Sequence, residues 1–190
     1  AEAALEAQKL QRQGIVPCLA VILVGEDPAS KVYVNNKKKA CEAVGILSRS
    51  YVLPADTEEK ELLDLVAQLN ADAGVHGILV QLPLPPHMDE NQVILAIDPK
   101  KDVDCFHPWN VGLAQMGQHG FVPCTPAGVM ELITRSGYAV EGKLCIVLEP
   151  CHILAKPIHL LLLQATCPLK ICPSNTMDLS RSSHTTGPTA

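Results

Sequence analysis

Aromatic side chains are scarce in this chain of 190 residues, at 3% of the total, so its core must be built from aliphatic side chains. No hydrophobic run is long enough to span a bilayer and no secretory signal pattern occurs, which favours a cytoplasmic protein, with an organelle matrix as the alternative. Excess positive charge is also absent. The formal net charge of -5 argues against nucleic acid or an acidic membrane as the main partner.

An initiating methionine is missing, and the chain begins at Ala1 within a helical pattern. We therefore expect a fragment of a longer protein. Cys-x-x-Cys pairs are missing too, although the chain has eight cysteines. Most of these lie in apolar runs of a chain that is large enough to fold without disulfides, so reduced core thiols are expected. Cys145, Cys151, His152 and Cys167 have the residue types of a zinc site but the wrong spacing, and no metal site is predicted.

Short apolar runs alternate with helical patterns along a chain that is 47% hydrophobic. The run 17–25 is continuous and bounded by turn formers, which is typical of a strand buried on both faces. Asp27-Pro28 predicts the start of a helix that Gly45 ends. Further elements are expected as a strand over 48–53, a helix with the apolar stripe Leu62, Val66 and Leu69 that begins with a capping box of Asp56 and Glu59, a strand over 75–82 and a helix over 91–97.

A second unit is predicted from residue 123 onward. Thr125 is expected to be the N-cap of a helix that has Pro126 at its first position and stops at Gly137. The elements expected after it are a strand over 143–148, a leucine-rich helix opened by Pro157, a strand over 169–172 and a poorly ordered tail after Asp178.

The alternation of strands and helices predicts an α/β fold. We expect a doubly wound, mostly parallel sheet domain over 1–122, followed by a linking helix and an incomplete Rossmann-like domain over 123–190. In such sheets ligands bind beyond the carboxyl ends of the strands. Polar residues that follow the strands are therefore the candidates for a site.

Tyr33 and Lys37 lie one helical turn apart, and Ser30 shares their face of the predicted helix. Most lysines on helices are merely solvated, but Lys37 has no obvious carboxylate partner one turn away. A lysine held beside an aromatic ring in a partly dry cleft suits proton transfer or the activation of water. Lys37 is therefore a candidate catalytic residue.

Gln81 follows the apolar run 75–80 and precedes the rigid segment Leu82-Pro83-Leu84-Pro85, which is able to orient its amide. An exposed turn glutamine is the alternative. In the loop that follows the next helix, Asp102 is expected to cap a turn or to pair with Lys100 and Lys101, whereas Asp104 is the better candidate for gripping an amino-pyrimidine edge. A lysine, an amide and a carboxylate beside a ring suit a flat, polar, amide-bearing heterocycle.

Several longer motifs occur in order between Gly25 and Pro126. They are Gly25-Glu26-Asp27-Pro28-Ala29-Ser30, Tyr33-Val34-Asn35-Asn36-Lys37, Leu69-Asn70-Ala71-Asp72, Gly77-Ile78-Leu79-Val80-Gln81-Leu82-Pro83-Leu84-Pro85, Lys101-Asp102-Val103-Asp104 and Pro123-Cys124-Thr125-Pro126. Together they make the chain closely resemble the bifunctional methylenetetrahydrofolate dehydrogenase/methenyltetrahydrofolate cyclohydrolase family. The resemblance implies NADP-dependent oxidation of 5,10-methylenetetrahydrofolate, hydrolysis of the product to 10-formyltetrahydrofolate, and a homodimer when the protein is complete.

The resemblance also implies roles for individual residues. Lys37 would be the central catalytic lysine, with Gln81 assisting it and Asp104 holding the pterin. Tyr33 would pack along the folate. Further substrate contacts are implied for Ser30, Val80, Leu82 and Pro83.

The cofactor loop departs from the family pattern. The family's Gly-Arg-Ser, continuing to Val-Gly-Lys-Pro, stands here as Glu149-Pro150-Cys151-His152-Ile153-Leu154-Ala155-Lys156-Pro157. Glycine permits close approach to a pyrophosphate and arginine supplies charge for a phosphate. Glu149 instead places a carboxylate there, and Pro150 lacks an N–H donor. We therefore expect NADP to bind weakly or not at all, and dehydrogenase activity to be absent.

The resemblance implies cofactor contacts from Thr125, Cys151 and Ser174, with NAD as the alternative to NADP. Cys105 stands where the family usually has glycine. About a third of a family member is missing, so a non-catalytic, dimerising remnant is the alternative function. A generic ligand-binding domain is a third possibility, which requires Lys37 to face away from Gln81.

Overall fold

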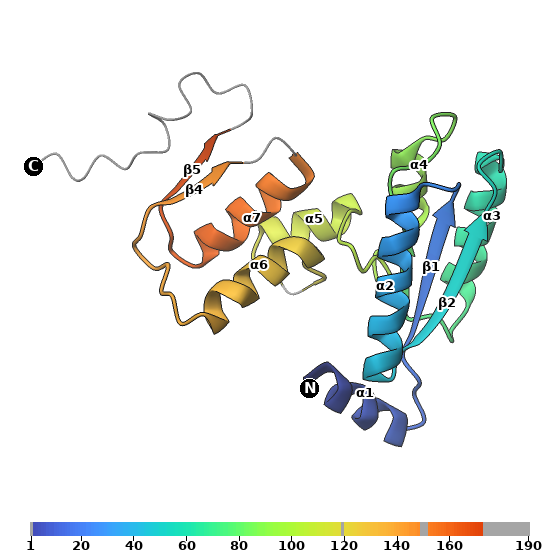
Figure 1. The fold of residues 1–190 in the computed structure, drawn as a ribbon, viewed down its shortest axis with the longest axis horizontal. Coiled ribbons are helices and arrows are strands. Elements are labelled where there is room, and N and C mark those ends of the chain that lie inside the picture. The colour runs from blue at the N-terminus through green and yellow to red at the C-terminus, as the bar shows by residue number, and fades with distance from the viewer. Residues whose placement is uncertain (1, 119, 149–151, 173–190) are drawn as a thin grey trace, which may run out of the picture. The chain divides into compact units, whose positions relative to one another are not determined.

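A computed structural model describes residues 2–118, 120–148 and 152–172, without the side chains of 152–156. Its coordinates divide into two compact units, 1–111 and 112–190. The elements, shown in Figure 1, are α1 (Glu2–Arg12), β1 (Cys18–Val24), α2 (Pro28–Val44), β2 (Leu47–Leu53), α3 (Glu59–Ala71), β3 (Gly77–Val80), α4 (Glu90–Ala96), α5 (Pro108–Gln115), α6 (Cys124–Arg135), β4 (Cys145–Leu148), α7 (His152–Gln164) and β5 (Leu169–Cys172).

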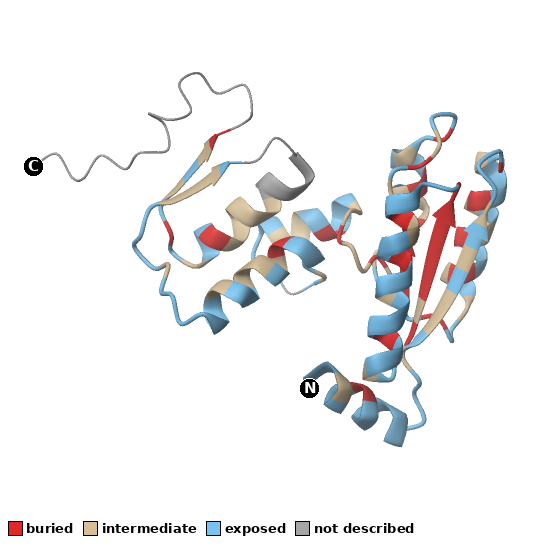
Figure 2. Cartoon of the chain, viewed as in Figure 1, coloured by how far each residue is buried: buried red, intermediate tan, exposed pale blue. Residues whose placement is uncertain are grey.

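The sheet of the first unit has the order β2-β1-β3, and both pairings are parallel. Every residue of β1 except Leu19 is buried, which confirms the strand predicted from the continuous apolar run (Figure 2). Alternate side chains of β1 enter two cores. Ala20 and Ile22 pack in the core that contains the buried residues of α3 and α4, and Val21 packs in the core that contains Val34 of α2. Helices therefore cover both faces, as the doubly wound prediction requires.

Helix α2, which carries the candidate lysine, has the predicted ends. The carboxylate of Asp27 accepts a hydrogen bond from the amide of Ser30 at 2.7 Å, and Gly45 closes the helix in the left-handed conformation with φ at 79°. Glycine adopts a positive φ without the clash that a Cβ would cause. Both signals are local, which explains why the sequence was sufficient.

The predicted capping box of α3 is wrong. The helix begins at Glu59, its N-cap is Glu58, and no side chain caps it. A capping box needs the glutamate at the third helical position, whereas Glu59 occupies the first. The carboxylate of Glu59 instead accepts a hydrogen bond from the amide of Asp89, the N-cap of α4. A contact between distant segments therefore took the place of the local one.

Lys101 closes the other end of α3. Its ammonium donates to the backbone carbonyls of Leu69, Asn70 and Asp72 at 2.8–2.9 Å. The last carbonyls of a helix have no partner within the helix, so a lysine at this position satisfies several of them at once. The two motifs 69–72 and 101–104 are thus joined by a structural contact.

The second unit contains a two-stranded parallel sheet in which Cys145 pairs with Leu169. Two predicted helix starts are wrong. The N-cap of α6 is Pro123 rather than Thr125, and Pro157 lies inside α7 rather than at its start. Pro126 falls in the first turn of α6, where backbone amides need no intrahelical partner, so it does not force the helix to begin at that proline.

The remaining expectations for this region are met in part. Strand β5 spans the predicted 169–172, and β4 is two residues shorter than its predicted range. Helix α5 was not predicted, and the division between the units falls within it. The predicted tail after Asp178 lies outside the described residues. The structure divides the chain after residue 111, and the domain boundary predicted after residue 122 stays a prediction.

Candidate active site

Lys37 and Gln81 meet at the carboxyl edge of the sheet. The ammonium of Lys37 donates to Oε1 of Gln81 at 3.3 Å. The backbone amide of Gln81, one residue after β3, donates to the carbonyl of Ile22 at 2.9 Å, and its side-chain Nε2 donates to the carbonyl of Leu82 at 2.8 Å. The amide is therefore held at both ends with its oxygen toward the lysine. A generic domain in which Lys37 faces away from Gln81 does not fit this geometry.

The charge of Lys37 acts on the carboxyl group of Asp104. Burial raises the pKa of the Asp104 carboxyl above its ordinary value, because a charged carboxylate loses hydration there. The positive charge of Lys37 opposes this rise, and the neighbouring Asp102 adds to it. A partly desolvated carboxyl beside a lysine suits a ligand group that donates hydrogen bonds.

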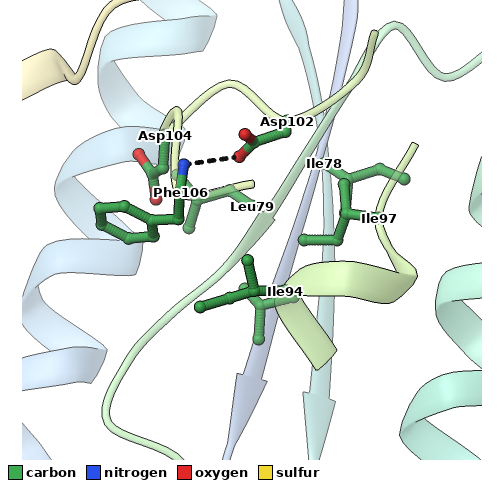
Figure 3. A pocket seen from close by; sticks show the side chains of 8 residues that line it. Ile78, Leu79, Ile94, Ile97, Asp102, Asp104 and Phe106 are labelled. Atoms are coloured by element: carbon green, nitrogen blue, oxygen red, sulfur yellow. Dashed lines mark hydrogen bonds between the residues drawn. The ribbon is translucent and has the colours of Figure 1, made fainter. Parts of the chain in front are cut away.

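Asp102 organises the loop that carries Asp104. Asp102 is 2% exposed, and its carboxylate accepts a hydrogen bond from the backbone amide of Phe106 (Figure 3). It also accepts hydrogen bonds from the backbone amide of His107 and from Nδ2 of Asn110. The distances are 3.3, 2.9 and 2.9 Å. Turn capping is one of the two structural roles that the sequence predicts for Asp102, and these contacts fit it. Its carboxylate is thus engaged by three donors within the protein.

Asn110 is a contributor that sequence reasoning missed. It is buried in α5, and its Nδ2 donates both to Asp102 and to the carbonyl of Pro99, the latter at 2.8 Å. It thereby ties the start of α5 to both sides of the loop. No periodic pattern marks α5, so the only available signal was an asparagine among small and apolar neighbours.

Cys105 separates Asp104 from the rest of this loop in an unusual backbone conformation. Its φ is 59° and it is 1% exposed. The left-handed region is unfavourable for a residue with a Cβ by about 1–2 kcal/mol. A glycine adopts this conformation without that penalty.

A small cavity lies behind the loop. Its volume is about 10 Å³, and its lining residues are Ile78, Leu79, Val80, Ile94, Ile97, Asp102, Asp104 and Phe106, most of which are labelled in Figure 3. A volume of this size holds roughly one water molecule. A bicyclic heterocycle does not fit into this cavity.

The remaining candidate substrate residues have different surroundings. Tyr33 is 60% exposed, which leaves its ring free to stack on a ligand. Ser30 is buried, and its amide serves the N-cap of α2. Val80 is the buried last residue of β3, and the Leu82–Pro83 peptide that follows Gln81 is cis. Val80 and the 82–83 segment thus lie beside Gln81 along the chain.

Of the candidate cofactor residues, Thr125 lies exposed in the first turn of α6. Glu149, Pro150, Cys151 and Ser174 fall outside the described residues. Among the residues that are described, no group of three or more His, Cys, Asp or Glu side chains is placed to hold a metal ion. Within the same part of the chain, no helix is both long and apolar enough to cross a membrane.

Two family models match the chain. Tetrahydrofolate dehydrogenase/cyclohydrolase, catalytic domain, matches residues 1–104, and the NAD(P)-binding domain of the same family matches residues 123–186. The bifunctional protein FolD of Agathobacter rectalis is 55% identical over 174 residues, and that of Acetivibrio thermocellus is 52% identical over 178 residues. The matches cover 92% and 94% of this chain, respectively, but 62% of each relative.

Solved structures agree with the sequence relatives. The bifunctional FolD enzyme of Campylobacter jejuni is 45% identical with a TM-score of 0.91, covering 95% of this chain and 64% of that one. The Trypanosoma brucei FolD enzyme, solved with NADP cofactor and inhibitor, is 36% identical with a TM-score of 0.89, covering 95% and 62%. On these matches, the chain belongs to the tetrahydrofolate dehydrogenase/cyclohydrolase family.

Proposed function

We propose that this chain carries the folate site of a one-carbon enzyme and hydrolyses 5,10-methenyltetrahydrofolate to 10-formyltetrahydrofolate. The observation that supports this most directly is the Lys37–Gln81 contact, with the amide held in place by the carbonyl of Leu82. The sequence relatives are bifunctional FolD proteins. A non-catalytic remnant would not need Lys37 and Gln81 to meet. Their contact therefore favours the catalytic function over the remnant.

Hydrolysis requires several proton transfers at the amidinium group of the substrate. Water adds to the positively charged amidinium carbon of the substrate and loses a proton, which leaves a hydroxyl group on that carbon. A carbon–nitrogen bond then breaks as one ring nitrogen gains a proton and the hydroxyl group loses its own to become the formyl oxygen. The ammonium or amine of Lys37 exchanges these protons, and Oε1 of Gln81, 3.3 Å away, holds the lysine in position. Tight positioning of this kind is a large part of catalysis in any enzyme.

Substrate binding in this proposal uses the surrounding groups. Asp104 grips the amino edge of the pterin, since a carboxyl near Lys37 accepts hydrogen bonds from N–H donors. The exposed ring of Tyr33 stacks on the folate. Ser30, Val80, Leu82 and Pro83 shape the wall beside it. A folate bound here lies beyond the carboxyl ends of β1 and β3, where parallel sheets bind ligands.

The oxidation step needs NADP, which supplies the hydride acceptor when it is bound. Residues 123–186 match the family's NAD(P)-binding domain, where the contacts to a cofactor would come from Thr125, Cys151 and Ser174. The donor set of this chain does not suit a nucleotide phosphate, since Glu149 is negative and Pro150 has no N–H. Titration of the purified chain with NADP tests this, and micromolar binding would contradict it.

The complete protein is further proposed to be a cytoplasmic homodimer. Its small-molecule partner is folate, and neither nucleic acid nor membrane takes part.

The decisive experiment mixes the chain with 5,10-methenyltetrahydrofolate and follows the loss of methenyl absorbance together with equilibrium binding. The proposal expects binding and hydrolysis faster than the uncatalysed reaction. Binding without acceleration would favour the remnant, and absence of binding would contradict the folate site itself.

A further inference from the structure

Two thiols of the second unit touch. Cys145 is the first residue of β4, and Cys167 lies in the short connection between α7 and β5. The sulfur of Cys167 lies 2.7 Å from the sulfur of Cys145 and 2.9 Å from the carbonyl oxygen of Lys143. The two residues are 22 positions apart in the chain. Their contact is therefore a product of the fold.

The backbone holds the pair in place. The amide of Cys145 donates to the carbonyl of Pro168 at 2.8 Å, and Cys145 is in register with Leu169 in the parallel β4–β5 pair. The residues on either side of the two sulfurs are thus fixed by hydrogen bonds. A disulfide bond is about 2.05 Å long, so the sulfurs need to approach by only about 0.7 Å more.

The two sulfurs differ in access. Cys167 is 1% exposed, whereas Cys145 is half-buried. A soluble oxidant therefore reaches Cys145 first, and Cys167 is placed to complete a bond with it. Burial, followed by the contact with Cys167, raises the pKa of the Cys145 thiol to about 11, so the reactive thiolate is scarce at neutral pH and the first step is slow.

We propose that Cys145 and Cys167 form a reversible intrachain disulfide when the chain meets a low-molecular-weight disulfide such as glutathione disulfide. The thiolate of Cys145 attacks one glutathione sulfur, the glutathione disulfide bond breaks, and one glutathione thiolate leaves. The thiolate of Cys167 then attacks the sulfur of Cys145 in the mixed disulfide, and the second glutathione leaves. The two cysteines lose two protons and two electrons, and the oxidant becomes two glutathione thiols.

The position of this bond sets its effect. Both cysteines lie at the amino ends of the parallel strands β4 and β5, whereas ligands of such sheets bind at the carboxyl ends. The disulfide pins the two strands and the returning α7 together without covering the ligand edge. The free thiols of the reduced chain and the disulfide of the oxidised chain are two states of the same site. The inference does not depend on the folate chemistry.

The test oxidises the full chain with glutathione disulfide, alkylates the remaining thiols and maps the tryptic peptides. Trypsin cuts after Lys143 and Lys170 but not between Lys156 and Pro157, so one peptide contains Cys145, Cys151 and Cys167. We expect this peptide to become about 2 Da lighter through the loss of two hydrogens and to take up one alkyl group rather than three. Reduction with dithiothreitol should restore three.

Matched variants identify the partners. Cys151→Ser should still lose two hydrogens and then take up no alkyl group, whereas Cys145→Ser and Cys167→Ser should not form the bond. The wild-type peptide gives the result even if one variant fails to fold. Three alkyl groups on the oxidised wild-type peptide, a stable glutathione adduct, or loss of the bond in Cys151→Ser would overturn the proposal.

Discussion

The two units of this chain differ in how fully their sheets are buried. In the first unit, β1 lies between two neighbours and is almost entirely buried. In the second, β4 and β5 pair only with each other among the described residues, and most of their side chains are partly exposed. A parallel sheet is normally covered on both faces. The first unit therefore contains the core that supports its site, whereas the second has less buried apolar surface around its strands.

The same contrast applies to chemistry. The candidate folate residues Lys37, Gln81 and Asp104 are all described and lie in the first unit. The candidate cofactor residues belong to the second unit, and of them only Thr125 is described. The proposed hydrolysis thus depends on the first unit. The substitutions below test whether this unit also contributes more to the free energy of unfolding than the second.

The largest effect is expected from Lys37→Met. Loss of a general acid–base group lowers kcat by about 10²- to 10⁴-fold, because no neighbouring group replaces its proton chemistry. Stability should change by no more than about 0.5 kcal/mol, as for most substitutions near the surface. Hydrolysis of 5,10-methenyltetrahydrofolate and denaturant unfolding measure the two.

Lys38→Met is the matched control for this variant, since Lys38 is exposed on the same helix. It should retain wild-type turnover. Unchanged turnover in Lys37→Met would reject the catalytic role, and an equal loss in both variants would point to a general effect of charge.

Paired core truncations compare the units directly. Ile22 of β1 is fully buried, and Ile146 of β4 is only partly buried. Ile22→Ala should lower the free energy of unfolding by about 2–5 kcal/mol, as buried isoleucines do when a cavity remains. Ile146→Ala should cost roughly 1 kcal/mol, in proportion to the smaller apolar area that it buries. Urea unfolding of both variants gives the values, and equal losses would remove the proposed difference between the sheets.

Lys101→Met tests the closure of α3. The variant leaves three backbone carbonyls without their charged donor, so the first unit should lose about 1–3 kcal/mol. Lys100→Met is the control, because Lys100 is exposed and its side chain should matter by less than about 0.5 kcal/mol. Thermal unfolding should separate them, and a stable Lys101→Met chain would show that water caps the helix equally well.

The successful sequence predictions rested on signals close together in the chain. The buried β1 followed from an uninterrupted apolar run, and the ends of α2 followed from Asp27 and Gly45. The Lys37–Gln81 contact followed from a helix face and a strand end that a parallel sheet brings to one edge. In each case local chemistry and the global fold give the same answer.

The errors fell where a distant segment decides the outcome. Asp56 is a good capping residue, but Glu59 is engaged by the amide of Asp89, 30 residues away. Asn110 was overlooked because its role depends on the carbonyl of Pro99 and the carboxylate of Asp102, which meet it only in the folded loop. No pattern within one element encodes such contacts.

The last prediction concerns Asp104→Asn, whose effect on stability depends on pH. The pKa of Asp104 is raised in the folded chain, chiefly by burial, so folding favours the protonated carboxyl. Its contribution to stability is therefore intact below the ordinary aspartate pKa of about 3.9 and is lost as the pH rises through the raised value. Asparagine has no charge to bury and avoids this loss.

Asp104→Asn should accordingly match the wild type near pH 3 to 4 and become the more stable chain as the pH approaches 7, a trend that urea unfolding at several pH values measures. At neutral pH it should also bind folate more weakly, because the proposed acceptor for the pterin amino group is replaced by an amide. Asp102→Asn is the contrasting variant, since its carboxylate accepts three hydrogen bonds and its loss should destabilise the loop. An Asp104→Asn chain that is less stable at pH 7 would show that attraction to Lys37 outweighs the burial of the charge.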